Sequence, residues 1–458
     1  MSSKNSSYSH WVKKNSYYHH YILSLYRSLI PAHQTVLQVG CKNGFVVKNI
    51  KAAQAVGIES DSKALQEALD TISHHAFYSS LEQVPVQTFD YIILSSSTHE
   101  TDDVQNLLQQ LQPYCSQKTR IIVDFYSFLW EPTLRVLQKL GFRRPTPLKN
   151  WLSFYDIKNF LYLAGFEVIT HQRKMLIPCY IPLISWVFNS FIANIPLINR
   201  LCLMEFIVAR PLVPKKEPAL FKASVIIPCR NEKGNIEPAV LRCPLMGKET
   251  EIIFVEGNSK DGTVEEIERI IKKYPEKTIK FLKQDGKGKG DAVRKGFEHA
   301  TGDILMIQDA DLTAPPEELP KFFNALIEGQ GEFINGSRLI YGMEEKAMRF
   351  LNMIANHGFA LGFSWLLGQR VKDTLCGTKV LFKKDYEKIA ANRHYFGEFD
   401  PFGDFDLLFG AAKQNLKIID LPVHYKQRTY GSTQIRRFYH GLLLVKMSII
   451  GLKKFKLY

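Results

Sequence analysis

Cysteine is scarce in this 458-residue chain and follows no pattern that binds metal or forms cross-links. There are seven cysteines, an odd number, and no two of them form a CxxC pair. This excludes a disulfide scaffold and a cysteine zinc site, and indicates a reduced, cytoplasmic protein. The amino-terminal residues lack the apolar run of a secretory signal. No internal repeat or low-complexity tract is present.

Two long stretches lack charge of one or both signs. No charged residue occurs from Met175 to Asn199, which is long enough to span a bilayer but contains three prolines. A membrane span, an interfacial or substrate-facing lid and a buried segment all remain open for it. No Asp or Glu occurs from Leu421 to Tyr458, where basic residues flank an apolar run at 441–452. That pattern is typical of an interfacial amphipathic helix, with a docking helix as the alternative.

Charge is unbalanced toward the basic side. The chain has 59 Lys and Arg against 45 Asp and Glu, a net charge of +14. Such a balance favours anionic partners such as nucleotide-sugars, acidic lipid headgroups or nucleic acid. No aromatic-and-basic RNA motif and no helix-turn-helix spacing is present, so we expect no nucleic-acid partner. The 45% hydrophobic and 23% charged content is ordinary for a globular protein.

Short apolar runs alternate with helical spacings in both halves, which predicts parallel sheets. The fold class we expect is α/β with two doubly wound domains. The predicted domains are an N-terminal extension (1–29), a Rossmann-like domain (30–210), a proline-rich linker (211–222), a second α/β domain (223–433) and a basic amphipathic tail (434–458). The predicted strand runs include 35–39, 91–94, 121–123, 224–227, 251–255 and 304–307.

A nucleotide-type turn follows the first predicted strand. Gly40 and Gly44 bracket the turn before a helix, and Glu59 follows the second strand, where an acid can hold a ribose. This half resembles the class I S-adenosylmethionine-dependent methyltransferases, over roughly residues 30–210. The resemblance implies a bound S-adenosylmethionine, held by Gly40, Gly44 and Glu59.

The turn departs from the family pattern at two positions. Gln38 stands where the family usually carries an acid, and Lys42 where it usually carries a third glycine. A lysine there crowds the backbone approach and places a cation beside a cationic ligand.

An acidic pair follows the predicted strand 304–307. If the strand geometry continues, Asp309 and Asp311 share one face and their carboxylates converge. Carboxylate oxygens suit Mg²⁺ or Mn²⁺, which can bridge to a diphosphate. The sequence therefore predicts a metal site at Asp309 and Asp311.

Four motifs precede or include this pair in the second half, at 225–232, 255–262, 286–296 and 301–311. In order and spacing they resemble the family 2 glycosyltransferases of the GT-A fold, and most nearly the polyprenyl-phosphate sugar transferases. The resemblance covers about residues 223–435. It implies a donor site for a UDP- or GDP-sugar built from Pro228, Arg230, Asn231, Glu232, Glu256, Asp261, Lys289, Arg294 and Asp309.

The resemblance also implies an acceptor side. The loop 373–379 matches the family's acceptor loop, and the family's acid falls on Asp406, with Asp404 as the alternative; Asp373 completes the catalytic set. Because a lipid phosphate is already anionic at pH 7, it needs no general base. Guanidinium groups match phosphate geometry, so Arg428 and Arg437 are predicted to hold the acceptor.

The sequence therefore predicts a metal-dependent inverting glycosyltransferase fused to a methyltransferase-like domain. Its acceptor would be a lipid phosphate or a glycan, and its place the inner, cytoplasmic face of a membrane. Two alternatives stay open. Methylation is the main activity and the sugar domain supplies its substrate, or the N-terminal domain is a non-catalytic scaffold. The sugar, the base and the oligomeric state are not set by the sequence.

Overall fold

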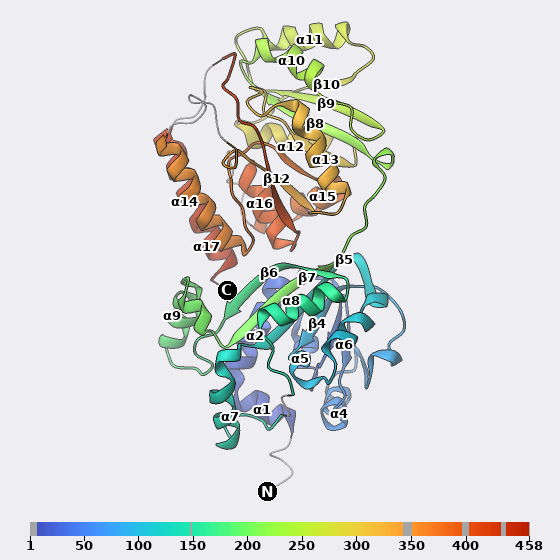
Figure 1. Cartoon of the computed structure of the whole chain (residues 1–458), viewed down its shortest axis with the longest axis vertical. Helices are drawn as coiled ribbons and strands as arrows, with labels where there is room; N and C mark the ends of the chain where they lie inside the picture. Colours follow the sequence, from blue (N-terminus) through green and yellow to red (C-terminus); the bar gives the residue numbers. More distant parts are fainter. Residues whose placement is uncertain (1–6, 147–148, 342–349, 396–402, 432–436, 458) are drawn as a thin grey trace. The chain divides into compact units, whose positions relative to one another are not determined.

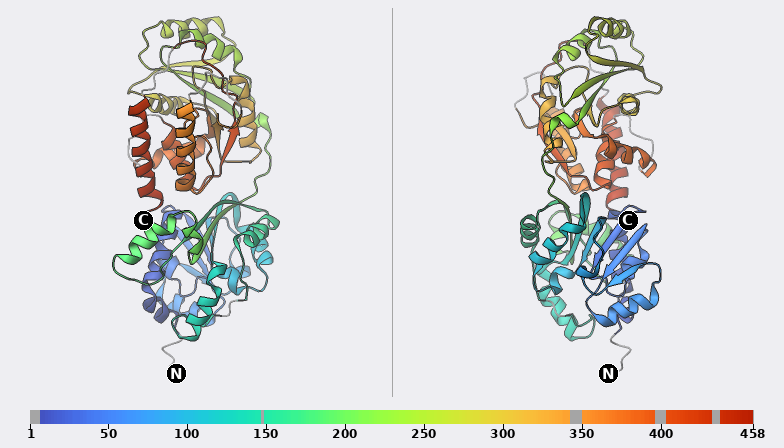
Figure 2. Two further views of the ribbon diagram at one scale, coloured as in Figure 1. Left: turned by 60° about the vertical axis from the view of Figure 1, so that its left-hand side comes forward. Right: turned by 90° about the vertical axis from the view of Figure 1, so that its right-hand side faces the viewer.

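The computed structural model describes residues 7–146, 149–341, 350–395, 403–431 and 437–457. The chain divides into two compact units, 1–212 with 455–458, and 213–454. Each unit is built around one seven-stranded sheet (Figures 1 and 2). We call them the N-terminal and C-terminal units.

The sheet of the N-terminal unit has the strand order β3-β2-β1-β4-β5-β7-β6. All neighbours are parallel except β7, which is antiparallel to β5 and β6. Chain order reverses between β1 and β4, and such a switch point opens a crevice at the carboxyl ends of the strands. The strands are β1 (Thr35–Val39), β2 (Gln54–Ile58), β3 (Ala76–Tyr78), β4 (Phe89–Ser95), β5 (Cys115–Tyr126), β6 (Phe166–Lys174) and β7 (Met204–Pro211).

Helices cover both faces of this sheet. Neighbouring strand residues alternate between two cores: Val36 packs with α2, α3, α4 and α7, whereas Leu37 packs with α6 and α8. This burial on both faces explains the continuous apolar runs of the strands. The helices are α1 (Tyr8–Lys14), α2 (Ser16–Leu29), α3 (Phe45–Asn49), α4 (Ser62–Thr71), α5 (Ser97–Glu100), α6 (Val104–Gln110), α7 (Glu131–Lys139) and α8 (Phe154–Leu163).

The uncharged stretch between β6 and β7 folds into short pieces. It contains α9 (Ile184–Ser190) and the 3₁₀ turns Ile192–Asn194 and Ile198–Leu201. Large apolar side chains along it are exposed, among them Tyr180, Leu183, Trp186, Leu197 and Leu201. Among the described residues, no helix combines the length and apolar character needed to cross a membrane.

The sheet of the C-terminal unit has the order β10-β9-β8-β11-β13-β12-β14. Its first four strands are parallel, β13 is antiparallel to β11 and β12, and β14 is parallel to β12. The strands are β8 (Lys222–Cys229), β9 (Glu249–Glu256), β10 (Thr278–Lys283), β11 (Ile304–Ile307), β12 (Phe333–Ser337), β13 (Lys379–Phe382) and β14 (Ile418–Pro422).

One face of this sheet packs against α10 (Lys233–Arg242), α11 (Thr263–Lys273) and α13 (Leu319–Ile327). On the other face, Gly296 of α12 (Lys289–His299) lies against Ile226. α15 (Lys383–Ala391) contacts β13, and α16 (Asp404–Lys413) packs on α15. The predicted fold class, two doubly wound α/β domains, is confirmed.

Two further helices, α14 (Phe350–Leu367) and α17 (Arg437–Phe455), lie side by side against α16 (Figure 1). Phe363 of α14 stacks on Phe409 of α16, and Gly451 of α17 lies against Leu366 and Phe409. The predicted amphipathic tail is therefore helical from Arg437 to Phe455, with one side packed on the unit. The described 3₁₀ turns of this unit are Pro218–Leu220, Pro316–Glu318 and Arg393–Tyr395.

Candidate functional site

Acidic side chains gather at the carboxyl ends of β8, β9 and β11, under the segment 423–431 that follows β14. We call this segment the strap. Its Arg428 bridges two carboxylates, at 3.0 Å from Glu232 and 2.6 Å from Asp311. Burial raises the pKa of Glu232, although the Arg428 guanidinium opposes the shift. The structure thus places Arg428 among the predicted donor residues.

The loops after β8 and β9 are tied to each other. Asn231 has a left-handed backbone (φ 56°), and its Oδ1 accepts the backbone N–H of Lys260 at 2.8 Å. The N–H of Asn231 donates to Ser259 Oγ at 2.9 Å, and the N–H of Ser259 donates to the buried carboxylate of Glu256. These bonds fix the polar edge that the sequence assigns to the donor nucleoside.

Asp261 serves the start of α11 and also contacts the strap. Its carboxylate accepts the N–H of Thr263 at 3.1 Å and the N–H of Lys233 at 3.2 Å. The hydroxyl of Tyr430 donates to it at 3.3 Å, and the Tyr430 ring lies against Gly234. Arg428 and Tyr430 thus both fasten the strap to this edge.

Asp309 and Asp311 do not share a strand face. β11 ends at Ile307, and the backbone N–H of Leu312 donates to the carbonyl of Asp309 at 3.2 Å, which closes a turn through Asp311. Asp309 pairs with Lys289 of α12 at 2.6 Å, while Asp311 pairs with Arg428. The expected continuation of the strand is thus corrected: tertiary partners, not strand alternation, orient the two acids.

The Asp309–Lys289 pair is half-buried. Gly377, in the loop 373–379, lies so close to the Asp309 carboxylate that an added Cβ would stand 2.1 Å from Oδ2. Burial alone would lower the pKa of Lys289, but Asp309 and Asp404 outweigh it and raise that pKa. Burial likewise opposes ionisation of Asp309, yet Lys289 holds its pKa below the ordinary value. Both groups are charged at neutral pH.

Two helix N-termini meet beside this pair. The N-cap of α16, Gly403, lies against Gly290 in the first turn of α12, where any side chain at 403 would collide with the backbone. Asp404, the first residue of α16, pairs at 3.0 Å with the buried Lys379. Helix N-termini and buried ammonium groups both favour bound anions.

The other two predicted acids have separate partners. Asp406 pairs with Arg393 at 2.6 Å. Asp373 is fully buried, and the Arg338 guanidinium holds both its oxygens, at 2.7 and 2.9 Å. Because its carboxylate is enclosed, we assign Asp373 to positioning the loop 373–379 rather than to contact with substrate.

The remaining predicted residues lie near this edge or outside the described part. Pro228 is the penultimate residue of β8, and the exposed Arg230 follows the strand. Arg294 lies half-buried on α12. The side chain of Arg437 is outside the described residues, so its predicted role stays a prediction. The sequence did not predict a role for Lys379, Arg338 or Arg393. Of these, only Lys379 could have been noticed in the sequence, because it is the last residue of the motif 373–379.

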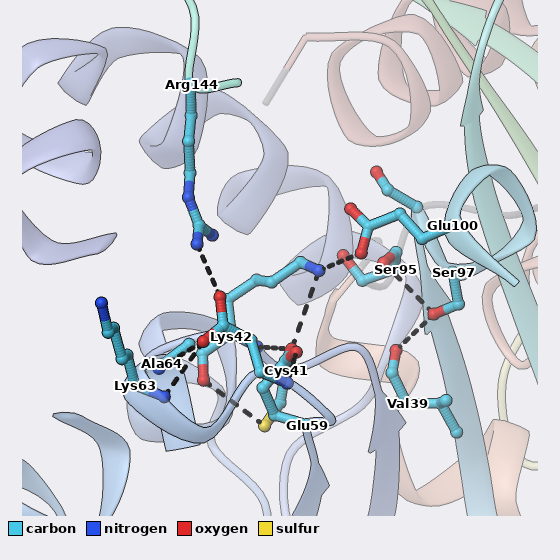
Figure 3. A network of polar contacts seen from close by, with 12 residues as sticks. Val39, Cys41, Lys42, Glu59, Lys63, Ala64, Ser95, Ser97, Glu100 and Arg144 are labelled. Atoms are coloured by element: carbon cyan, nitrogen blue, oxygen red, sulfur yellow. Dashed lines mark hydrogen bonds and ion pairs between the residues drawn. The ribbon is translucent and has the colours of Figure 1, made fainter. Parts of the chain in front are cut away.

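The nucleotide-type turn of the N-terminal unit has the expected backbone. Gly40 and Gly44 have φ of 74° and 73°, and Lys42 between them has φ 54°. Glu59 follows β2, is buried, and accepts the N–H of Lys42 at 2.8 Å and of Asp61 at 2.9 Å. Figure 3 shows the Lys42 side chain running toward Glu59 and Glu100. Lys42 Nζ lies 2.5 Å from Glu100 and 3.7 Å from Glu59.

Two family models match the chain. "Glycosyl transferase family 2" matches residues 224–389, and "Methionine biosynthesis protein MetW" matches residues 20–183. A dolichol-phosphate mannosyltransferase from Pyrococcus furiosus is 31% identical over 252 residues, covering 50% of this chain and 68% of that protein. The chain belongs to the family 2 glycosyltransferases.

Further relatives of this glycosyltransferase match over a smaller share of their length. The dolichol-phosphate mannosyltransferase of Saccharomyces cerevisiae is 43% identical over 108 residues, 22% of this chain and 40% of that protein. An undecaprenyl-phosphate 4-deoxy-4-formamido-L-arabinose transferase from an Enterobacter species is 25% identical over 225 residues, 48% of this chain and 64% of that protein.

Solved structures resemble each unit of this glycosyltransferase weakly. A SAM-dependent methyltransferase from Thermotoga maritima matches 44% of this chain over 93% of its own length, at 16% identity and a TM-score of 0.36. Glucosyl-3-phosphoglycerate synthase from Mycobacterium tuberculosis matches 51% of this chain over 80% of its own length, at 17% identity and a TM-score of 0.38. With the family match at 20–183, the N-terminal unit is methyltransferase-like.

Proposed function

We propose that this glycosyltransferase moves a sugar from a nucleoside diphosphate donor to a polyprenyl phosphate. The observation that carries the proposal is the meeting of Asp309, Lys289 and the N-termini of α12 and α16 at the carboxyl end of β11. The relatives, a dolichol-phosphate mannosyltransferase and an undecaprenyl-phosphate sugar transferase, support the choice of acceptor.

The donor lies along the edge from β9 to β11. Glu256 and the Asn231 turn take the nucleoside, and Lys289 with Lys379 and the two helix N-termini neutralise its diphosphate. Arg294 and Arg230 add positive charge at this edge. The fully buried Lys379 ammonium acts strongly because little water screens it.

Asp309 and Asp311 supply carboxylate oxygens, the ligands that Mg²⁺ and Mn²⁺ prefer, so the donor set fits such an ion. The ion would add positive charge at the leaving diphosphate. Both carboxylates are now paired with Lys289 and Arg428, so metal binding would loosen these two pairs. Among the described residues, no cluster of three or more His, Cys, Asp or Glu side chains forms a metal site. The protein would then supply two side-chain ligands to the ion, and oxygens of the sugar donor and water would supply the others.

In the transfer, a phosphate oxygen of the lipid attacks the anomeric carbon of the sugar. The bond from that carbon to the diphosphate breaks, the nucleoside diphosphate leaves with the electron pair, and the configuration inverts. The attacking phosphate is anionic at pH 7, so no side chain has to remove a proton. The work of the protein is to position two anions and to stabilise the leaving charge.

Exposed apolar and basic side chains suit contact with a membrane, where a polyprenyl phosphate acceptor would lie. Along α17, Leu442, Val445 and Ile449 are exposed at helical spacing, with Lys446 and Lys453 exposed on the same side. Apolar side chains beside lysines fit a bilayer interface with anionic headgroups. The exposed apolar side chains of the segment 175–201 in the N-terminal unit also suit a bilayer interface. We place the enzyme at the cytoplasmic face of a membrane.

The proposal is tested by donor binding and by transfer. UDP-glucose, UDP-GlcNAc, UDP-galactose and GDP-mannose are added with and without Mn²⁺ in a thermal-shift assay. The sugar from a stabilising donor is then followed into solvent-extractable lipid in the presence of a polyprenyl phosphate. We expect one donor to stabilise the protein with Mn²⁺ and to label the lipid.

Asp309→Asn and Asp311→Asn should each abolish both signals, whereas Asp285→Asn, at a largely exposed carboxylate, should keep them. Donor binding without any labelled lipid would overturn the acceptor assignment. Absence of stabilisation by every donor would overturn the donor site.

A further inference from the structure

The crevice at the carboxyl ends of β1 and β2 holds a lysine where its backbone favours glycine. At Gly40, Lys42 and Gly44 the backbone is left-handed, which an L side chain adopts reluctantly. The turn has therefore kept its shape while a long cationic side chain has entered it.

The Lys42 ammonium lies inside the crevice and not in solvent. Its side chain is 14% exposed, and its charge is met by Glu100 and Glu59 (Figure 3). Burial would lower the pKa of Lys42, but Glu59 and Glu100 raise it, so the cation is permanent at neutral pH.

Other parts of the unit cover the same turn. Asn43 donates to Ser9 Oγ of α1 at 3.1 Å, and the backbone N–H groups of Tyr8 and Ser9 donate to Glu67 of α4. Arg144 pairs with Asp61 at 2.7 Å and lies over the Tyr8 ring. The N-terminal helix α1 and Arg144 thus lie next to the turn.

S-adenosylmethionine does not fit these residues. The acid that would take its ribose, Glu59, holds the Lys42 backbone N–H at 2.8 Å, and the Lys42 ammonium lies 3.7 Å from its carboxylate. The cofactor carries a sulfonium cation, and the acids of the crevice already hold one cation, Lys42.

We propose that Lys42 is a built-in occupant of this crevice. Its side chain keeps S-adenosylmethionine out, so the N-terminal unit is non-catalytic, and removing that side chain opens a nucleoside site. The inference concerns the N-terminal unit alone and does not rest on the proposed sugar transfer.

Titration calorimetry of the full chain with S-adenosylmethionine and with S-adenosylhomocysteine tests it. Lys42→Gly is the opening variant, because glycine accepts a φ of 54° without strain. Lys48→Ala, at an exposed lysine of the adjacent α3, controls for the loss of one charge near the turn. Near-ultraviolet circular dichroism confirms that each variant is folded.

We expect no binding heat from the unaltered chain or from Lys48→Ala, and measurable binding of S-adenosylhomocysteine by Lys42→Gly. Binding by the unaltered chain would overturn the proposal. Failure of a folded Lys42→Gly to bind would overturn it too, because Lys42 would then not be the closing group.

Discussion

Asp404 and Asp406 stand two residues apart on the first turn of α16 but belong to different ion pairs. Asp404 pairs with Lys379, and its charge acts on Lys289 at the Asp309 site. Asp406 pairs instead with Arg393. The family resemblance ranks Asp406 first, whereas the contacts favour Asp404 for the transfer.

We predict that Asp404→Asn lowers kcat about 100-fold with little change in donor affinity, since one positioned charge is worth roughly 2–4 kcal/mol in the transition state. Asp406→Asn should instead lower the free energy of unfolding by about 1–3 kcal/mol, because Arg393 loses its partner. Steady-state kinetics and urea unfolding measure the two effects. A fully stable but inactive Asp406→Asn would reverse this assignment.

Glu251 of β9 is a buried acid outside the site. Its carboxylate accepts bonds from Ser224 and the N–H of Gly302 and lies 2.9 Å from Lys280. Burial opposes its ionisation, yet these partners lower the pKa of Glu251 to about 2. Its folded pKa is thus below its unfolded value of about 4.3.

It follows that Glu251 adds stability above about pH 4.3, and that this stability is lost as the pH falls toward 2. Glu251→Gln should lower the free energy of unfolding on the order of 2 kcal/mol at pH 7. The difference from the unaltered chain should shrink steadily below pH 4.3 in urea unfolding. Glu268→Gln, at an exposed glutamate of α11, is the control. A pH-independent difference would contradict the linkage.

At the scale of elements, α17 offers a direct test of membrane contact. Replacing Leu442, Val445 and Ile449 by serine should reduce sedimentation with anionic vesicles at least tenfold, because three apolar side chains no longer enter the interface. The matched control replaces three other exposed leucines of the same unit, Leu220, Leu241 and Leu245. Equal losses from both triple variants would exclude a specific role for α17.

At the scale of the whole molecule, the fold could be predicted from the sequence more fully than the side-chain contacts could. Runs such as 35–39 and 224–227 are strands because both faces of each sheet are buried, a pattern visible in composition alone. Spacing and the family resemblance named Glu232, Asp309 and Glu59 as candidates, and their roles stay predictions. The sequence could not show that Asp309 pairs with Lys289, that Asp311 pairs with Arg428 or that Arg338 holds Asp373, since these pairs join residues distant in sequence. Lys42 stood out as an anomaly, but its partner Glu100 did not.

The two units have consequences for how the protein melts. The core around β8 draws only on residues of the C-terminal unit, and the cores around β1 only on residues of the N-terminal unit. Cooperativity therefore belongs to each unit, and calorimetric unfolding should resolve into two transitions, with no single midpoint for the chain. A sugar donor then raises one transition and a nucleoside in the opened Lys42→Gly crevice raises the other. One heating scan thus reports which half of the molecule a ligand has found.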